Sequence, residues 1–275
     1  MKRFLIISAF LCVCTVSFAQ TDSLSARYAP LDSLLNEFYG TLKFEISETK
    51  CHEADYLIGM CQDSLTRQHV ALNIFDHYRD SKVMGDESVS IYLYDNWFRN
   101  GKVKFDGDLA ELDAEVFVKF NRFCQLDSTA VPVTLFKPCG GKAEIPVKGH
   151  TSVLFFYDTH CSKCLLETAV LPDVLNDVDF PLTFYAVYTG TDKASWKQYR
   201  RKKLRISNRN VRLVHLWDPE LESSYQLYYG VFGTPRMYLV DPEGTIIGRR
   251  LEVENLKMLL PAAGAIQATY DRFYK

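Results

Sequence analysis

The spacing of apolar residues along the chain changes near residue 130. Before that point apolar positions recur at spacings of three and four, which predicts helices over residues 31–38, 64–78 and 109–123. Residues 88–98 fit both a strand and a helix, and we assign them to a helix. After residue 130, short apolar runs alternate with helical stretches, a pattern typical of an α/β unit. We therefore predict an α/β fold, in which a mixed sheet flanked by helices follows a mainly helical N-terminal domain.

The helix predicted over residues 109–123 carries apolar residues at spacings of three and four, which puts them on one face, and we expect this face to pack against another element. Its members are Leu109, Leu112, Val116, Phe120 and Phe123.

The second half of the chain divides into strands and helices in a regular order. Val131 to Phe136 and Glu144 to Val147 flank Gly140-Gly141 and predict a β-hairpin. Ser152 to Tyr157 is a continuous apolar run, typical of a central strand that is covered on both faces. The further predicted strands are 182–188, 211–216, 236–240 and 245–248, and the predicted helices are 161–171, ending near Pro172, 193–203, one that begins at Asp218-Pro219, and one from Val253 onward.

The first twenty residues differ in character from the rest. Lys2 and Arg3 precede an apolar stretch, and Ser17-Phe18-Ala19 has the small residues typical of a cleavage site. This pattern predicts a secretory signal peptide over residues 1–19 and an exported, periplasmic protein, with an uncleaved membrane anchor as the alternative. The predicted domains are then a helical N-terminal domain over residues 20–128 and the α/β domain over residues 129–275.

Composition narrows the class of protein. The chain has 275 residues, 47% of them hydrophobic and 24% charged, with a net charge of −2, which indicates a packed globular protein and excludes wholesale disorder. The near-neutral balance gives no indication of nucleic-acid binding, and we interpret the basic run from Arg200 to Lys203, with Arg205, as a solvated helix end. Two of the eight cysteines lie in the predicted signal peptide. In an exported protein the others are expected to pair or to form a redox couple.

Cys161 and Cys164 stand where the predicted central strand leads into the next helix. Unpaired N–H groups at the first turn of a helix, together with the Lys163 ammonium, stabilise a thiolate on Cys161. The spacing of three residues lets the second sulfur close a disulfide without moving the backbone. We therefore predict that Cys161 is the nucleophile of a redox couple and that Cys164 resolves the mixed disulfide.

Two other interpretations of this cysteine pair are less well supported by the sequence. A zinc site needs two more ligands, and the chain has no second C-x-x-C or H-x-x-x-H pair, so we expect no metal. A purely structural disulfide that closes a loop of two residues would constrain the unfolded chain very little.

Four motifs in the predicted α/β domain form a specific combination. They are Phe155-Phe156-Tyr157-Asp158-Thr159-His160-Cys161-Ser162-Lys163-Cys164, Trp217-Asp218-Pro219, Tyr229-Gly230-Val231-Phe232-Gly233-Thr234-Pro235 and Leu239-Val240-Asp241-Pro242-Glu243-Gly244. Residues 131–262 thereby resemble the exported bacterial branch of thioredoxin-fold thiol-disulfide oxidoreductases, similar to those used in cytochrome c maturation. The N-terminal half resembles, less specifically, the helical domain that precedes such modules.

The resemblance implies roles for residues outside the cysteine pair. Pro235 is expected to be cis and to face Cys161, and Thr234 to offer backbone groups to a substrate chain, the alternative being an ordinary trans proline. Glu167 is expected to relay protons, the alternative being an exposed helical carboxylate. His160 replaces the usual tryptophan, and its imidazole either favours the neighbouring thiolate or is merely exposed.

The activity that the resemblance implies is reduction of protein disulfides by dithiol exchange. The implied partners are protein thiol and disulfide substrates and a membrane-linked dithiol donor that resets the pair, with no cofactor beyond the Cys161–Cys164 disulfide. A disulfide isomerase and a non-catalytic binding module with the same fold are the alternatives. A peroxidase signature is absent before Cys161, so peroxiredoxin activity is not expected.

The other four cysteines are Cys51, Cys61, Cys124 and Cys139, and they allow three pairings if all are oxidised. Cys124 and Cys139 flank the predicted domain boundary and are candidates for a bond across it, with free buried thiols as the alternative. A Cys51–Cys61 bond requires a break between the two residues, because a helix would separate its ends by about 15 Å. The N-terminal domain shows no catalytic constellation, and we hypothesise that it serves substrate selection or dimerisation.

Overall fold

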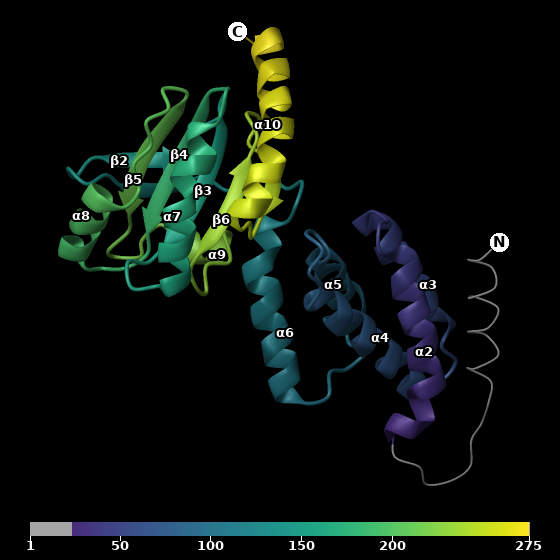
Figure 1. Cartoon of the computed structure of the whole chain (residues 1–275). Coiled ribbons are helices and arrows are strands. Elements are labelled where there is room, and N and C mark those ends of the chain that lie inside the picture. The colour runs from purple at the N-terminus through teal and green to yellow at the C-terminus, as the bar shows by residue number, and fades with distance from the viewer. Residues whose placement is uncertain (1–23, 275) are drawn as a thin grey trace. The chain divides into compact units, whose positions relative to one another are not determined.

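The computed structural model describes residues 24–274, and the chain divides into two compact units (Figure 1). The division follows Val118, inside helix α6 (Asp108–Asn121), about ten residues before the boundary expected from the sequence. The predicted signal peptide over residues 1–19 lies outside the described residues. Among the helices that are described, none has the length and apolar character needed to cross a bilayer.

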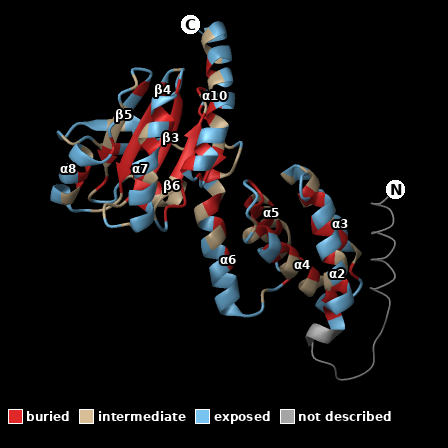
Figure 2. Cartoon of the chain, viewed as in Figure 1, coloured by how far each residue is buried: buried red, intermediate tan, exposed pale blue. Residues whose placement is uncertain are grey.

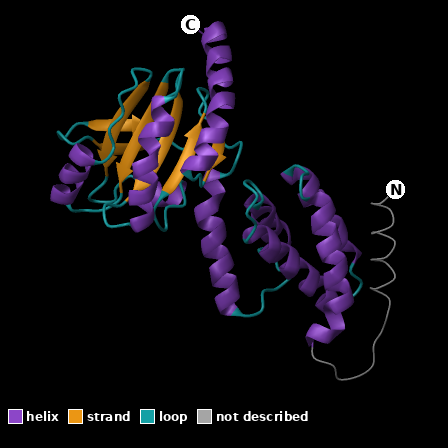
Figure 3. Cartoon of the chain, in the orientation of Figure 1, coloured by secondary structure: helices purple, strands orange, loops and turns teal. Residues whose placement is uncertain are grey.

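The first unit is helical, as predicted (Figure 3). One apolar core joins its helices, with Leu35, Ile58, Ile74 and Phe75 fully buried in it. Asp63 accepts a hydrogen bond from the Thr66 N–H and so caps the helix predicted to begin there. The elements are α2 (Leu24–Leu42), α3 (Ser47–Met60), α4 (Ser64–Arg79), α5 (Glu87–Leu93), the π-helix η1 (Tyr94–Phe98) and the first part of α6.

The buried face of α6 is not the face that the apolar pattern predicted. Leu109, Leu112 and Phe123 are exposed by 81%, 55% and 39%. Ala114 and Val118, which lie one turn apart, are buried instead. The prediction was wrong for Leu109 and Leu112, because α6 has apolar residues on a second face as well. At the end of the predicted face, Phe120 lies against Phe232 and Phe123 against Tyr228, as expected.

The second unit is built on a mixed sheet of seven strands in the order β2-β1-β5-β4-β3-β6-β7. Strand β3 pairs in parallel with β4 and antiparallel with β6, and β4 pairs in parallel with β5. Every residue of β3 and β4 is buried, as Figure 2 shows, which confirms the predicted central strand. The strands are β1 (Val133–Phe136), β2 (Lys142–Ile145), β3 (Thr151–Tyr157), β4 (Leu182–Tyr188), β5 (Val211–Trp217), β6 (Arg236–Val240) and β7 (Ile246–Arg249).

Both faces of this sheet carry a core, because successive strand residues point to opposite sides. On one face Phe155 and Tyr157 pack with α7 (Ser162–Asn176), α8 (Lys193–Lys202) and α10 (Val253–Tyr274). On the other, Leu154 and Phe156 pack with α9 (Tyr225–Tyr228) and with Cys124 of the 3₁₀ helix η2 (Arg122–Cys124). The expected sheet flanked by helices is thus confirmed.

Two predicted helix boundaries were wrong. Helix α7 continues through Pro172 to Asn176, because Leu171 and Leu175 are buried against the sheet and this burial offsets the missing N–H of the proline. No helix begins at Asp218. Its carboxylate instead accepts hydrogen bonds from the backbone of Glu222 and Ser223 and so organises a loop.

Candidate redox site

Cys161 and Cys164 form a disulfide at the junction of β3 and α7. Cys161 is the N-cap of α7, and its Sγ accepts a hydrogen bond of 3.1 Å from the Cys164 N–H. Cys164 is fully buried, whereas Cys161 is half-buried. Cys161 therefore carries the sulfur that a substrate can reach, next to a backbone donor that favours negative charge on it.

The loop that leads into β6 lies against Cys161, although 73 residues separate the two segments. The Thr234 carbonyl oxygen lies 3.3 Å from Cys161 Sγ, and the Thr234–Pro235 peptide bond has the expected cis form. The antiparallel pairing of β3 with β6 explains this meeting, because Phe156 at the end of β3 is opposite Arg236 at the start of β6. Strand pairing thus brings the two motifs together.

Lys163 and Glu167 are both held by the start of the last helix, α10. Lys163 Nζ lies 2.5 Å from the Glu252 carboxylate, and this ion pair lowers the pKa of Glu252. Glu167 Oε2 accepts a hydrogen bond of 2.8 Å from the N–H of Val253, the first residue of α10. The two side chains therefore connect the cysteine-bearing helix to the C-terminal helix in this state of the protein.

His160 precedes Cys161 in an exposed turn. Its side chain is 73% exposed and its Nδ1 lies 3.4 Å from Asp158 Oδ1, while its backbone N–H donates to the same oxygen at 2.7 Å. Asp158 therefore fixes the turn that presents Cys161.

Sequence reasoning missed a buried group of hydroxyls behind Cys164. Thr168 donates a hydrogen bond of 2.6 Å to the Cys164 carbonyl, and its hydroxyl also pairs with the Tyr199 hydroxyl of α8. The Tyr199 ring stacks on Tyr157 at 4.7 Å, and the Tyr157 hydroxyl accepts a hydrogen bond from Trp196 Nε1. Burial raises the pKa of Tyr199 to about 12, so this phenol stays protonated at neutral pH.

The only available signal for this group was Thr168, a lone hydroxyl one turn after Cys164 in an apolar stretch. Nothing in the spacing of the chain indicated that α8 would bring Tyr199 against it.

The remaining cysteines have different surroundings. Cys51 and Cys124 are thiols outside any disulfide, and burial raises the pKa of both, that of Cys51 to about 12. Cys61 follows the unbroken helix α3 and donates from its thiol to Leu57 O. Cys139 is an exposed thiol in the turn between β1 and β2.

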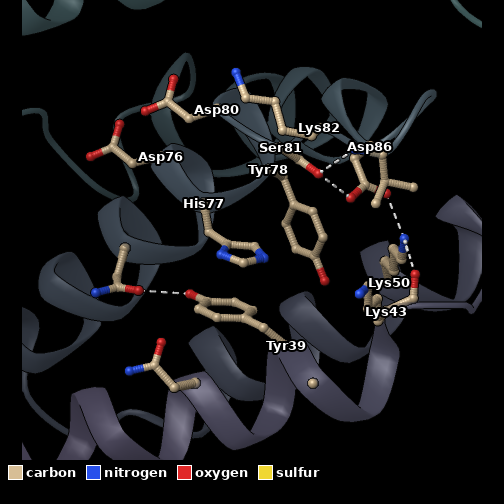
Figure 4. A pocket seen from close by; sticks show the side chains of 14 residues that line it. Tyr39, Lys43, Lys50, Asp76, His77, Tyr78, Asp80, Ser81, Lys82 and Asp86 are labelled. Atoms are coloured by element: carbon tan, nitrogen blue, oxygen red, sulfur yellow. Dashed lines mark hydrogen bonds and ion pairs between the residues drawn. The ribbon is translucent and has the colours of Figure 1, made fainter.

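The helical unit contains a pocket with a volume of about 680 Å³ (Figure 4). Tyr39 stacks on His77 at 3.6 Å along one side of this pocket. On another side a buried ion pair joins Lys50 to Asp86 at 2.5 Å. The pocket has no cysteine in its lining, and within the part of the chain that the structure describes no group of three or more His, Cys, Asp or Glu side chains is placed to hold a metal ion.

Comparison with known proteins finds similar folds. A thioredoxin-like protein from Bacteroides caccae matches with a TM-score of 0.66 over 92% of this chain and 92% of its own, at 12% identity. The thioredoxin domain of a thiol-disulfide oxidoreductase from Bacteroides vulgatus covers 50% of this chain and 97% of its own, at 23% identity and a TM-score of 0.43. A thiol:disulfide interchange protein from Bacteroides sp. covers 51% and 90%, at 25% identity and a TM-score of 0.42.

No family model and no curated protein matches the chain. The B. caccae likeness covers nearly the whole of both chains, the helical region included. The chain therefore has a thioredoxin-like fold preceded by an N-terminal helical region.

Proposed function

We propose that the protein is an exported thiol-disulfide oxidoreductase that reduces disulfides in protein substrates. The observation that carries the proposal is the position of Cys161 at the N-cap of α7, where its Sγ lies 3.1 Å from the Cys164 nitrogen and 3.3 Å from the Thr234 oxygen. A substrate can reach a sulfur in this position, and the helix N-terminus stabilises the thiolate form of that sulfur. The second cysteine sulfur lies within bonding distance.

The reaction begins when the Cys161 thiolate attacks one sulfur of a substrate disulfide. A new bond joins Cys161 to that sulfur, and the electron pair of the broken bond leaves on the second substrate sulfur, which takes up a proton. Cys164 then loses its proton and its thiolate attacks Cys161 Sγ, which releases the first substrate sulfur as a second thiol. The substrate is reduced by two electrons and the protein ends with the Cys161–Cys164 disulfide.

Each neighbouring residue has a part in this scheme. The Cys164 N–H and the first turn of α7 stabilise the attacking thiolate. The backbone at Thr234 pairs with the extended substrate chain beside the mixed disulfide. Glu167, one turn after Cys164, accepts the proton that Cys164 gives up.

Resetting the couple needs an external dithiol, which we propose to be linked to the membrane, and no metal or organic cofactor. Export rests on the pattern of residues 1–19, and the mass of the protein recovered from a periplasmic fraction tests it. Cleavage near Ala19 is the expected result.

A redox titration of the full-length protein tests the activity, with Cys161→Ser as the control that lacks the couple. We expect a reducing potential, and a value near −120 mV, typical of strong disulfide-forming enzymes, would contradict the proposal. Cys164→Ser should accumulate mixed disulfides with substrates, which identifies them. Greater activity on scrambled disulfides than on simple reduction would favour an isomerase instead.

A further inference from the structure

The charge of the chain is unevenly distributed around the redox site. Residues 193–212 contain nine basic residues and no acidic one, although the whole chain has 34 acidic residues against 32 basic. None of the nine forms an ion pair with a carboxylate in the described part of the chain. Arg200 lies over the Trp196 ring, and the other eight are exposed. This basic segment comprises Lys193, Lys197, Arg200, Arg201, Lys202, Lys203, Arg205, Arg209 and Arg212.

One end of the basic segment lines a pocket next to the cysteines. The pocket has a volume of about 260 Å³, and its lining includes His160, Leu165, Gln198, Lys202 and Lys203. His160 immediately precedes Cys161, and Leu165 directly follows Cys164. The pocket therefore shares its lining with the residues that flank the two cysteines, although neither cysteine lines it, and two ammonium groups lie on its α8 side.

Two carboxylates contact side chains of the lining without lining the pocket themselves: Asp158 lies 3.4 Å from His160 Nδ1, and Asp192 accepts a hydrogen bond of 2.6 Å from the Ser195 hydroxyl. Asp158 accepts the His160 N–H, and Asp192 caps α8 by accepting from the backbone of Ala194 and Ser195. No carboxylate lines the pocket, so Lys202 and Lys203 present their charge to whatever enters it. Cations at a helix C-terminus stabilise the helix, but that role requires neither the pocket nor its position beside Cys161.

The size and polarity of the pocket indicate its occupant. At about 260 Å³ it lies below the range of roughly 300–1,000 Å³ for small-molecule sites, which suits a side chain of a larger partner. Ammonium, imidazole and amide groups around a concave site are complementary to a carboxylate. A membrane surface would use the exposed basic segment as a whole and would have no need of a concavity at the redox site.

We propose that this pocket binds an acidic side chain of the substrate polypeptide, so that disulfides flanked by Asp or Glu are the preferred substrates. The inference rests on the proposed function, since it adds a substrate class to the same site. Lys202 and Lys203 act on recognition and on the rate of encounter, and the sulfur chemistry itself is unchanged.

The test uses two synthetic peptides that share one disulfide and differ only in Glu or Gln at the positions flanking it. We expect the reduced full-length protein to react with the Glu peptide roughly tenfold faster at low ionic strength, with the advantage falling as salt rises. Lys202→Gln/Lys203→Gln should reduce the advantage to about twofold or less, while the rate with the Gln peptide stays the same. Arg209→Gln/Arg212→Gln removes the same charge from the basic segment away from the pocket and should keep the preference.

Equal rates for the two peptides, or an equal loss in both double variants, would overturn the proposal. An equal loss together with binding to phosphatidylglycerol vesicles would assign the basic segment to an anionic membrane surface, which also overturns it.

A redox-independent measurement separates this inference from the proposed function. A fluorescein-labelled Glu peptide without cysteine is titrated with the full-length Cys161→Ser/Cys164→Ser protein, and anisotropy reports binding. If the reduced protein reacts with neither peptide disulfide, the proposed function fails. Binding that Lys202→Gln/Lys203→Gln weakens several-fold would still support the pocket, and absence of binding would exclude it.

Discussion

The hydroxyl of Thr168 has one proton, which it donates to the Cys164 carbonyl, so the Tyr199 hydroxyl must donate to Thr168. Thr168→Val therefore leaves the buried phenol without its acceptor, and we expect it to destabilise the protein by about 1–3 kcal/mol in urea unfolding. Tyr199→Phe keeps the bond to Cys164 and should cost less, about 0.5–1.5 kcal/mol. If Thr168→Val/Tyr199→Phe regains none of the stability that Thr168→Val loses, the Tyr199 hydroxyl is not left unsatisfied by the loss of Thr168 and this prediction is wrong.

A second residue, His215 of β5, makes stability depend on pH. Burial and, to a smaller extent, the nearby charge of Arg200 together lower the pKa of His215 to about 4. The unfolded chain binds a proton near pH 6.5, so stability is lost as pH falls from about 6.5 to about 4.

The size of the His215 effect is up to about 3 kcal/mol, because each unit of pKa shift corresponds to about 1.4 kcal/mol. Urea unfolding at several pH values measures it, and His215→Leu should flatten the pH dependence over this window. An NMR titration of the His215 ring with a midpoint near 6.5 would contradict the assignment.

Between elements, a buried ion pair connects α3 to the turn before α5. Lys50 and Asp86 have side chains only 3% and 6% exposed, and Ser81 also donates to Asp86 (Figure 4). Lys50→Ala leaves a buried carboxylate without its cation and should destabilise the helical unit by about 3–5 kcal/mol, measured by hydrogen exchange of α3. Lys163→Gln is the matched control, since the Lys163–Glu252 pair has the same length but is more than half exposed, and it should cost less than about 1 kcal/mol.

Helices and strands were predictable from the sequence where a local pattern of apolar residues determined them. The apolar runs of β3 and β4 and the helix α4 correspond to the structure closely, because burial on both faces and the helical spacing of apolar residues are local properties of the sequence. The course of α7 through Pro172 depends on packing against the sheet. The loop around Asp218 depends on hydrogen bonds that its carboxylate accepts from the backbone N–H groups of Glu222 and Ser223. Local propensity does not contain that information.

The candidate site divides in the same way. Cys161 and Cys164 were predicted from their junction, and Pro235 from its motif. Tyr199 and the pocket lined by Lys202 were not, since both require α8 to pack beside α7. The sequence alone indicated only a solvated helix end at Arg200 to Lys203, whereas the fold places Lys202 and Lys203 in the lining of a pocket.

At the scale of the whole chain, the thioredoxin-like part begins earlier in the structure than the sequence indicated. Cys124 is fully buried in its core, Phe120 packs on Phe232 at 4.0 Å, and Asn121 accepts hydrogen bonds from Arg249 and Arg250. These residues precede the boundary at residue 128 that the sequence suggested. Part of α6 and η2 thus belongs to the sheet-containing unit.

A pair of truncations tests this boundary. A protein that starts at Asp127 loses Phe120, Asn121 and Cys124, and we expect it to be less stable by about 3–6 kcal/mol than one that starts at Asp108, which lowers Tm by roughly 10 °C or more. Both retain Cys161 and Cys164, so their redox potentials, titrated below either Tm, should agree. Equal Tm values would show that the 119–126 segment contributes nothing to the sheet-containing unit.

If the longer piece reduces the same protein substrates as the full chain and has the same oligomeric state, the helical unit serves neither substrate selection nor dimerisation.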